Sequence, residues 1–202
     1  MVQDRGTAKG YLQDVTEIPA LAPLVSRIRQ ELGEVDILVC SAGTNIRQLA
    51  HEVTEDAWDV VLTVNTKGLF FSNQAVAIQS MIPRKTGVIV NIASTMGLVG
   101  GPQRVAYCAS KGAVVQLTRA EAVDWAPYNI RVNAVAPTYV LTKLTKGILK
   151  DPEVKKYVLD NTPLHRLATL DEVAAAVCFL ASDAASMITG VILPVDGGWT
   201  AR

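Results

Sequence analysis

Short runs of apolar, often β-branched residues alternate along this chain with longer segments of helical periodicity. Four runs, at residues 35–39, 88–92, 130–135 and 191–195, are continuous in apolar character, which is typical of buried strands covered on both faces. Between them, apolar residues recur at helical spacing over residues 18–32, 54–81, 105–125 and 170–181. This order of elements predicts an α/β fold built on a doubly wound parallel sheet.

The composition suits one domain with a sizeable core, because half of the 202 residues are hydrophobic. Nineteen basic and nineteen acidic residues cancel, so the charge favours neither nucleic acid nor an anionic membrane as a partner. No apolar run is long enough to span a bilayer, and the first residues do not resemble a signal peptide. We therefore expect a cytoplasmic protein. We expect no metal site, because the two histidines and three scattered cysteines form no ligand cluster.

Two local features refine this prediction. Pro194 suits the end of a strand or a sheet edge, because proline cannot donate a ladder hydrogen bond. The segment 138–162 is the longest stretch between strong elements, with a short helical pattern around residues 151–159. We expect this segment to form a mobile flap over a functional site.

The candidate chemistry centres on Tyr107 and Lys111, which lie four positions apart and so share one face of a helix. A free tyrosine has a pKa of about 10, and a nearby ammonium lowers that pKa by stabilising the phenolate. Such a pair can move a proton to or from a substrate hydroxyl. Ser94 ends a strand 13 positions before Tyr107, where its hydroxyl can hold the substrate oxygen. Taken alone, Tyr107 and Lys111 fit an ordinary surface pair on a helix better than a catalytic pair.

Further short motifs give this pair its context. In chain order they are Asp14-Val15, Cys40-Ser41-Ala42-Gly43, Asn65 within VNTKG, Ser94 within VNIAS, Tyr107 to Lys111, Pro137 to Thr142, and Asp196-Gly197-Gly198. This ordered set resembles the short-chain dehydrogenase/reductase family from about residue 10 to the C-terminus. The resemblance implies an oxidoreductase that uses NAD or NADP to interconvert a secondary alcohol and a ketone.

The resemblance also implies a role for each matching residue. Ser94 orients the substrate, Tyr107 is the acid/base, and Lys111 binds the nicotinamide ribose and lowers the pKa of the tyrosine. Asn65 helps to hold a water relay behind the lysine. The cofactor also meets Asp14 and Val15 beside the adenine, Ala42 and Gly43 along its length, and Val140 and Thr142 at the carboxamide.

Two departures from the family pattern are visible. Cys40 and Ser41 replace the asparagines of an Asn-Asn-Ala-Gly motif, and a thiol cannot make the amide hydrogen bonds that asparagine makes between strands. Thr138 stands where a glycine usually follows the proline, which restricts the backbone and adds bulk near the nicotinamide. We expect the first change to affect sheet stability more than chemistry.

A dinucleotide-binding, Rossmann-like fold opens with a strand, a glycine-rich turn and a helix whose N-terminus meets the pyrophosphate. No Gly-x-x-x-Gly-x-Gly sequence occurs in the 202 residues. We therefore expect a single Rossmann-like domain over residues 1–202 that is truncated at its N-terminus and lacks the first β-α-β portion. An incomplete sequence of an ordinary enzyme and a genuine short product are both consistent with this.

The loop after Gly43 suggests a class of substrate. Arg47 could pair with a substrate carboxylate through two parallel hydrogen bonds, although an ordinary surface arginine is the simpler alternative. The stretch AGTNIRQ resembles family members that act on sugar acids, such as gluconate 5-dehydrogenases and 2-deoxygluconate 3-dehydrogenases. The general pattern fits 3-oxoacyl-(acyl-carrier-protein) reductases almost as well.

A different class of function is that of a catalytically impaired subunit that serves in oligomer assembly. Family members usually form dimers or tetramers through the helices predicted at residues 54–81 and 105–125, and we expect a homo-oligomer here, such as a homotetramer. Trp58, Leu69, Phe70 and Phe71 are candidate interface residues, with core packing as the alternative.

Overall fold

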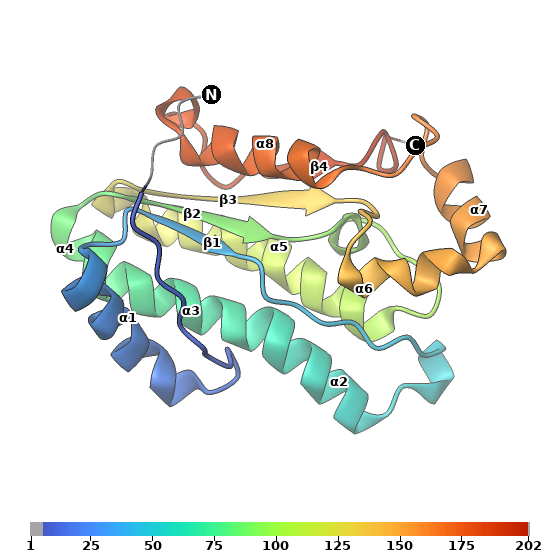
Figure 1. Ribbon diagram of the computed structural model, residues 1–202, viewed down its shortest axis with the longest axis horizontal. Helices are drawn as coiled ribbons and strands as arrows, with labels where there is room; N and C mark the ends of the chain where they lie inside the picture. The colour runs from blue at the N-terminus through green and yellow to red at the C-terminus, as the bar shows by residue number, and fades with distance from the viewer. Residues whose placement is uncertain (1–5, 202) are drawn as a thin grey trace.

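A parallel sheet forms the centre of the protein in this computed structural model, which describes residues 6–201 apart from the side chains of Lys143, Leu144 and Ile148 (Figure 1). The strands are β1 (Ile37–Cys40), β2 (Gly87–Ile92), β3 (Ile130–Pro137) and β4 (Ile192–Val195). Within the described residues they pair in the order β1-β2-β3-β4, and all three pairings are parallel. Each strand is therefore joined to the next by a crossover connection, as the sequence predicts.

Helices cover both faces of the sheet. Helices α3 (Leu69–Val76) and α5 (Val105–Trp125) pack on one face with α1 (Ile18–Leu32) against α3, and α8 (Leu170–Ala181) packs on the other (Figure 1). The remaining helices are α2 (Glu55–Leu62), α4 (Ile82–Arg84), α6 (Lys143–Lys146) and α7 (Pro152–Asp160). This arrangement confirms the predicted α/β class, and the bounds of α1, α5 and α8 agree with the sequence prediction.

The core lies on both sides of the two central strands. Ile89 and Val132 belong to the cluster under α1, α3 and α5, whereas Val90 and Val135 pack with Leu180 of α8. All five side chains are almost completely buried. Neighbouring residues on a strand point to opposite faces, so a strand covered on both sides must be apolar at consecutive positions.

Strand β1 differs from its prediction in where it begins and in its burial. It begins at Ile37 rather than at residue 35, and the backbone N–H of Val35 instead donates to the Ser80 hydroxyl at 2.7 Å. Ile37 and Val39 are 49% and 43% exposed, because within residues 6–201 only the opposite face of this strand is covered. The predicted position of Pro194 is confirmed, since it lies in β4, an edge strand of the described sheet.

The helix predicted over residues 54–81 contains two π-helical turns and runs on to Arg84. Thr54 caps it by accepting a hydrogen bond from the N–H of Ala57 at 3.2 Å. The π turns span Thr63–Gly68 and Ala77–Met81. The last residue of α4 is Arg84, and the C-cap residue Lys85 has a φ of 53°. Extra residues in a helical turn are often found at functional sites, and the first π turn carries Asn65.

The segment 138–162 is more ordered in secondary structure than the sequence predicts. It contains α6, a 3₁₀ turn at Ile148–Lys150 and α7, whose first turn is capped by the Asp151 carboxylate. Val158 of α7 is 1% exposed and packs in a cluster with Trp199. In the described part of the chain no helix is both long and apolar enough to cross a membrane.

Candidate active site

Two adjoining hollows lie at the carboxyl ends of β1, β2 and β3, where ligands bind in open α/β sheets. The lysine hollow is lined by residues that include Gly43, Ser94, Tyr107, Lys111, Val140 and Thr142. The arginine hollow is lined by residues that include Asn45, Ser94, Arg104, Tyr107, Thr138 and Tyr139. Because Ser94, Tyr107 and Thr138 line both, the two hollows adjoin at these side chains, and we refer to them together as the cleft.

Helix α5 presents Tyr107 and Lys111 to the lysine hollow from its first two turns. The Nζ atom of Lys111 lies 5.9 Å from the centre of the Tyr107 ring and donates a 2.7 Å hydrogen bond to the carbonyl of Ile92 at the end of β2. The lysine is 4% exposed, and burial lowers its pKa to about 8, because the charged amine loses hydration. A buried cation therefore stands beside the phenol.

Ser94 follows β2 and is 8% exposed. It lines both hollows, so its hydroxyl is available at the cleft. Its Oγ accepts a 3.1 Å hydrogen bond from the N–H of Met96, which opens a 3₁₀ turn. The turn packs closely on α5, since a Cβ on Gly97 would lie 2.5 Å from the carbonyl oxygen of Lys111. This contact fixes the serine turn against the helix that carries Tyr107.

The pKa of Tyr107 is raised above its ordinary value, which differs from the lowered pKa that the sequence predicts. Burial of the phenol causes the rise, while a hydrogen bond with the Ser94 side chain and the charge of Arg104 act against it. Desolvation therefore outweighs the favourable charges. The charge of Arg104 is one of the influences that lower the pKa of the phenol, and the Lys111 amine donates its hydrogen bond to the Ile92 carbonyl rather than to the phenol.

Asn65 is fully buried and joins the loop after β1 to helix α5. Its Oδ1 accepts from the N–H of Thr44 at 2.7 Å, and its Nδ2 donates to the carbonyl of Thr44 and to the Ser110 hydroxyl, both at 2.9 Å. A Cβ placed on Gly43 would lie 3.4 Å from Asn65 Oδ1 and 3.7 Å from Lys111 Nζ. Asn65, Gly43 and Lys111 therefore converge at one point of the lysine hollow.

The other predicted cofactor residues divide into two sets. Val140 and Thr142 follow β3 and line the lysine hollow, and the Thr142 hydroxyl caps α6 by accepting from the N–H of Thr145. Ala42 is exposed and lies outside the residues that line either hollow. The structure thus brings Val140 and Thr142 to the cleft with Gly43, whereas Ala42 is only next to it in the chain.

Asp14 and Val15 lie before α1 and do not line either hollow. Val15 packs against the first π turn, where a Cβ on Gly68 would come within 2.9 Å of the Val15 carbonyl oxygen. The Asp14 carboxylate accepts hydrogen bonds from the N–H and hydroxyl of Thr16, which lower the pKa of Asp14. Val15 therefore contacts the π turn that also carries Asn65, whereas the Asp14 carboxylate bonds within its own loop.

Both departures from the family pattern have a visible consequence. The thiol of Cys40 donates to Oδ1 of Asn73, with a sulfur to oxygen distance of 3.0 Å, so it joins a buried polar network without an amide. The hydroxyl oxygen of Thr138 is buried and has no hydrogen-bond partner within residues 6–201. Thr138 therefore brings an unsatisfied polar atom to the wall shared by both hollows.

Arg47, the predicted substrate contact, is not among the residues that line the two hollows. Its NH2 group donates to Oε1 of Gln103 at 2.9 Å, and its Nε is buried without a partner among the described residues. The guanidinium is close enough to lower the pKa of Tyr139 by its charge. The structure thus places Arg47 near Tyr139 and Gln103, outside the residues that line the two hollows.

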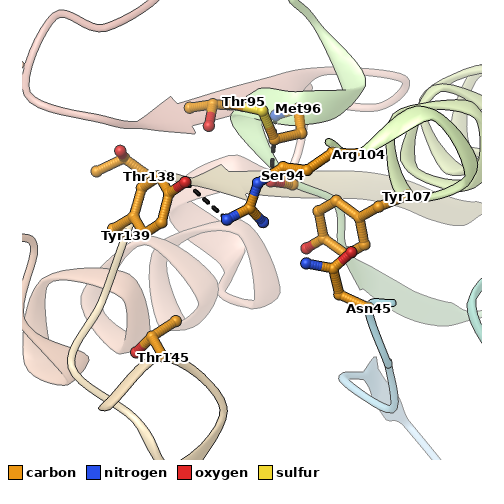
Figure 2. A pocket seen from close by; sticks show the side chains of 9 residues that line it. All are labelled: Asn45, Ser94, Thr95, Met96, Arg104, Tyr107, Thr138, Tyr139 and Thr145. Carbon is orange, nitrogen blue, oxygen red and sulfur yellow. Dashed lines mark hydrogen bonds between the residues drawn. The ribbon is translucent and has the colours of Figure 1, made fainter. Parts of the chain in front are cut away.

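Arg104 lines the arginine hollow and was not predicted from the sequence. Its NH2 group donates to the Tyr139 hydroxyl at 2.8 Å, and its guanidinium carbon lies 5.1 Å from the centre of that ring. Figure 2 shows the guanidinium between the rings of Tyr139 and Tyr107, with Asn45 beside Tyr107. No motif marks this residue in the sequence; Arg104 is the N-cap residue of α5, three positions before Tyr107.

Several known proteins are similar to this chain in amino-acid sequence. The family model described as enoyl-(acyl carrier protein) reductase matches residues 1–200. The 2-dehydro-3-deoxy-D-gluconate 5-dehydrogenase of Dickeya dadantii is 41% identical over 189 residues, which are 94% of this chain and 75% of the relative. The 3-oxoacyl-(acyl-carrier-protein) reductase of Thermotoga maritima is 38% identical, over 96% of this chain and 77% of the relative.

A solved structure agrees with these relatives. The crystal structure of a gluconate 5-dehydrogenase from Burkholderia cenocepacia in complex with NADP and tartrate superposes with a TM-score of 0.91 at 36% identity, covering 94% of this chain and 74% of that one. With the cleft described above, these matches show that the chain belongs to the short-chain dehydrogenase/reductase family, whose members are oxidoreductases.

Proposed function

We propose that this protein is an NAD- or NADP-dependent dehydrogenase that interconverts a secondary alcohol and a ketone, with a sugar acid of the gluconate type as its substrate. The observation that carries the proposal is the placement of Ser94, Tyr107 and Lys111 in one cleft at the carboxyl edge of the sheet. The names of the relatives support the choice of substrate, since two of the three act on gluconate-type compounds.

In alcohol oxidation, the phenolate of Tyr107 accepts the proton of the substrate hydroxyl while the carbinol carbon loses its hydrogen as a hydride and the C=O bond forms. In ketone reduction, the phenol returns this proton to the carbonyl oxygen. When bound, the nicotinamide supplies or accepts the hydride. Ser94 holds the reacting oxygen by a hydrogen bond, and Lys111 with Asn65 supports the proton transfer from the opposite side.

The lysine hollow fits a nicotinamide and its ribose. Its walls include apolar Ile92 and Val140, and its buried Lys111 amine is oriented by a single hydrogen bond to the Ile92 carbonyl. Gly43 keeps the space in front of that amine free of a side chain. We propose that Lys111 and Tyr107 hold the ribose, with Val140 and Thr142 at the carboxamide.

The adenine half of the cofactor site is more distant from the cleft. We propose that Asp14 and Val15 flank the adenine, and that Ala42 and Gly43 line the path between the two halves. Contact of Val15 with Gly68 supports this, because it joins the adenine residues to the turn that holds Asn65. No Gly-x-x-x-Gly-x-Gly sequence lies within the 202 residues, so we assign no pyrophosphate contact to this chain.

We further propose that residues 1–202 act as one Rossmann-like domain in a cytoplasmic dimer or tetramer. The single sheet supports the first point, and the free thiols of all three cysteines are in keeping with a reducing compartment. Trp58 is 38% exposed on α2 and is available to an oligomer interface. Leu69 is not, because it is 4% exposed and belongs to the core under the sheet.

The substrate side carries one further assignment and one alternative. We propose that Arg47 helps to attract an acidic substrate, since its charge acts on Tyr139 at the edge of the arginine hollow. The alternative is 3-oxoacyl-(acyl-carrier-protein) reduction, the reaction for which the Thermotoga maritima relative is named. Oxidation of D-gluconate with NAD or NADP supports the first function, and reduction of acetoacetyl-CoA with NADPH supports the second.

The assignment of Tyr107 is tested by Tyr107→Phe, with Tyr128→Phe as a matched control outside the cleft. Loss of the phenol proton should lower kcat by roughly 10³-fold or more, while NADPH binding persists. The control should keep its activity. Unchanged turnover in Tyr107→Phe would remove this residue from the mechanism, and an intact oligomer that binds neither NADH nor NADPH would favour the assembly role instead.

A further inference from the structure

Arg104 is a buried cation that has no acidic partner among residues 6–201. It is 7% exposed, and none of the ion pairs between described residues includes it. Removing a guanidinium from water is costly unless an opposite charge or several hydrogen-bond acceptors replace the lost hydration. The Tyr139 hydroxyl accepts a hydrogen bond from one of its five N–H groups, and Arg104 lines the hollow, so a ligand there can meet further N–H groups of the guanidinium.

Two other polar groups in the same hollow are also unsatisfied. Oδ1 of Asn45 and the hydroxyl oxygen of Thr138 are buried and have no hydrogen-bond partner within residues 6–201. Both residues line the arginine hollow with Arg104, and so do the Ser94 and Tyr107 side chains that meet the reacting oxygen (Figure 2). Because buried polar groups are normally paired, two unpartnered oxygens beside a buried guanidinium that has no acidic partner among the described residues indicate a polar, anionic ligand.

We propose that Arg104 binds the carboxylate of the substrate and is the residue that selects an acidic substrate over a neutral polyol. Asn45 and Thr138 take hydroxyl groups of the same molecule. This inference rests on the proposed function, because it places the carboxylate next to the oxygen that Tyr107 protonates. Tyr139 acts as a positioning residue, since its hydroxyl and ring face hold the guanidinium in the hollow.

Arg47 is less suited to this contact. Its NH2 group is already engaged by Gln103, and its side chain does not line the arginine hollow. Arg104 presents its guanidinium fork directly to the hollow, and a planar fork can bind both oxygens of a carboxylate. The two arginines therefore differ in access to the substrate, although both carry the same charge.

The test compares D-gluconate with D-glucitol, which share a six-carbon polyol chain and differ in the terminal carboxylate. For Arg104→Gln, the preference for gluconate in kcat/KM should fall by roughly 10- to 100-fold, as expected for loss of a charged hydrogen bond. Arg47→Gln should change it by less than about fivefold, because its contribution is only a longer-range charge effect. Arg119→Gln, an exposed arginine on α5, should leave it unchanged.

A binding measurement separates this inference from the proposed function. The rise in Tm caused by gluconate needs no turnover, and it should be lost in Arg104→Gln and kept in Arg119→Gln. Failure to oxidise any sugar acid would overturn the proposed function alone. Equal stabilisation of wild type by gluconate and glucitol, or a full gluconate effect in Arg104→Gln, would overturn the role of Arg104.

The conservative variant guards against misfolding of the glutamine variant. Arg104→Lys keeps the charge and loses the planar fork, so its preference for gluconate should fall by a smaller factor, roughly three- to tenfold. If Arg104→Gln does not fold, a wild-type preference in Arg104→Lys would contradict the proposal.

Discussion

Two groups of buried polar side chains, one between the sheet and helices α3 and α5 and one around the arginine hollow, differ in how they meet their hydrogen-bonding needs. Between the sheet and helices α3 and α5, Asn73 accepts from Cys40 and donates to Asn91 at 3.0 Å and to Glu121 at 2.9 Å. Asn91 in turn donates to Thr118 at 3.0 Å. This set, the core network, is satisfied almost entirely by its own members.

The arginine hollow shows the opposite arrangement. Arg104 has no acidic partner in the described part of the chain, and Asn45 and Thr138 each hold a buried oxygen that no described group contacts. A polar group that stabilises the fold must be paired in the folded chain, whereas a group that binds a ligand is paired only by that ligand. The two sets of buried polar residues therefore serve stability and recognition, respectively.

The largest expected effect comes from a substitution at the centre of the core network. Asn73→Ala removes the partner of Cys40, Asn91 and Glu121 together, and buried groups left unpaired are costly. We expect the free energy of unfolding to fall by about 3 kcal/mol, measured by chemical denaturation. Asn45→Ala in the arginine hollow is the control and should cost less than about 1 kcal/mol. Similar losses in the two variants would erase the distinction between the regions.

A second effect concerns the exception within the core network. Glu121 is 4% exposed, its Oε1 has no partner within residues 6–201, and burial raises its pKa from 4.5 to about 7. Hydrogen bonds from Asn73 and Asn91 oppose this rise. The folded protein therefore holds a proton on this carboxyl more tightly than the unfolded chain does, so stability decreases as pH rises between about 4.5 and 7.

Glu121→Gln tests this point because glutamine cannot ionise. Above pH 7 the wild type carries the full cost of a buried carboxylate, and we expect the variant to be more stable by up to about 3 kcal/mol. This advantage should shrink as pH falls through the window and vanish below about pH 4.5. Urea denaturation at several pH values measures it, and a pH-independent difference would contradict the raised pKa.

The parts of the fold that depend on local pattern were predictable from the sequence. The limits of α5 follow from a long run of helical periodicity that Pro127 ends, and the central strands follow from continuous apolar runs. The exposure of Ile37 and Val39 was not predictable, because it depends on what covers the strand. The π turn around Asn65 has no local sequence signature either.

The site divides in the same way. Ser94, Tyr107 and Lys111 were identified by their spacing together with the ordered motifs that resemble those of the family. Arg104 belongs to no such motif, and its importance appears only when its burial and lack of an acidic partner are known. The direction of the pKa shift of Tyr107 likewise depends on desolvation, which a sequence does not report.

The smallest expected effect is also the most direct comparison, because the same substitution is made in both regions. Thr118→Val removes a hydroxyl that accepts from Asn91 and donates to the carbonyl of Val114 at 2.8 Å, so it should destabilise the fold by about 1 kcal/mol. Thr138→Val removes a buried hydroxyl that has no described partner, so it should stabilise the fold by up to about 1 kcal/mol.

Opposite shifts of Tm, each about 2–4 °C, would then arise from one change of a hydroxyl to a methyl. The stabilised Thr138→Val protein should in addition have a KM for D-gluconate raised by roughly threefold to tenfold, because the substrate loses a hydrogen bond that the free protein never made. If both variants lose stability, the Thr138 hydroxyl already has a hydrogen-bond partner in the free protein. It is then not an open site for hydrogen bonding to a ligand.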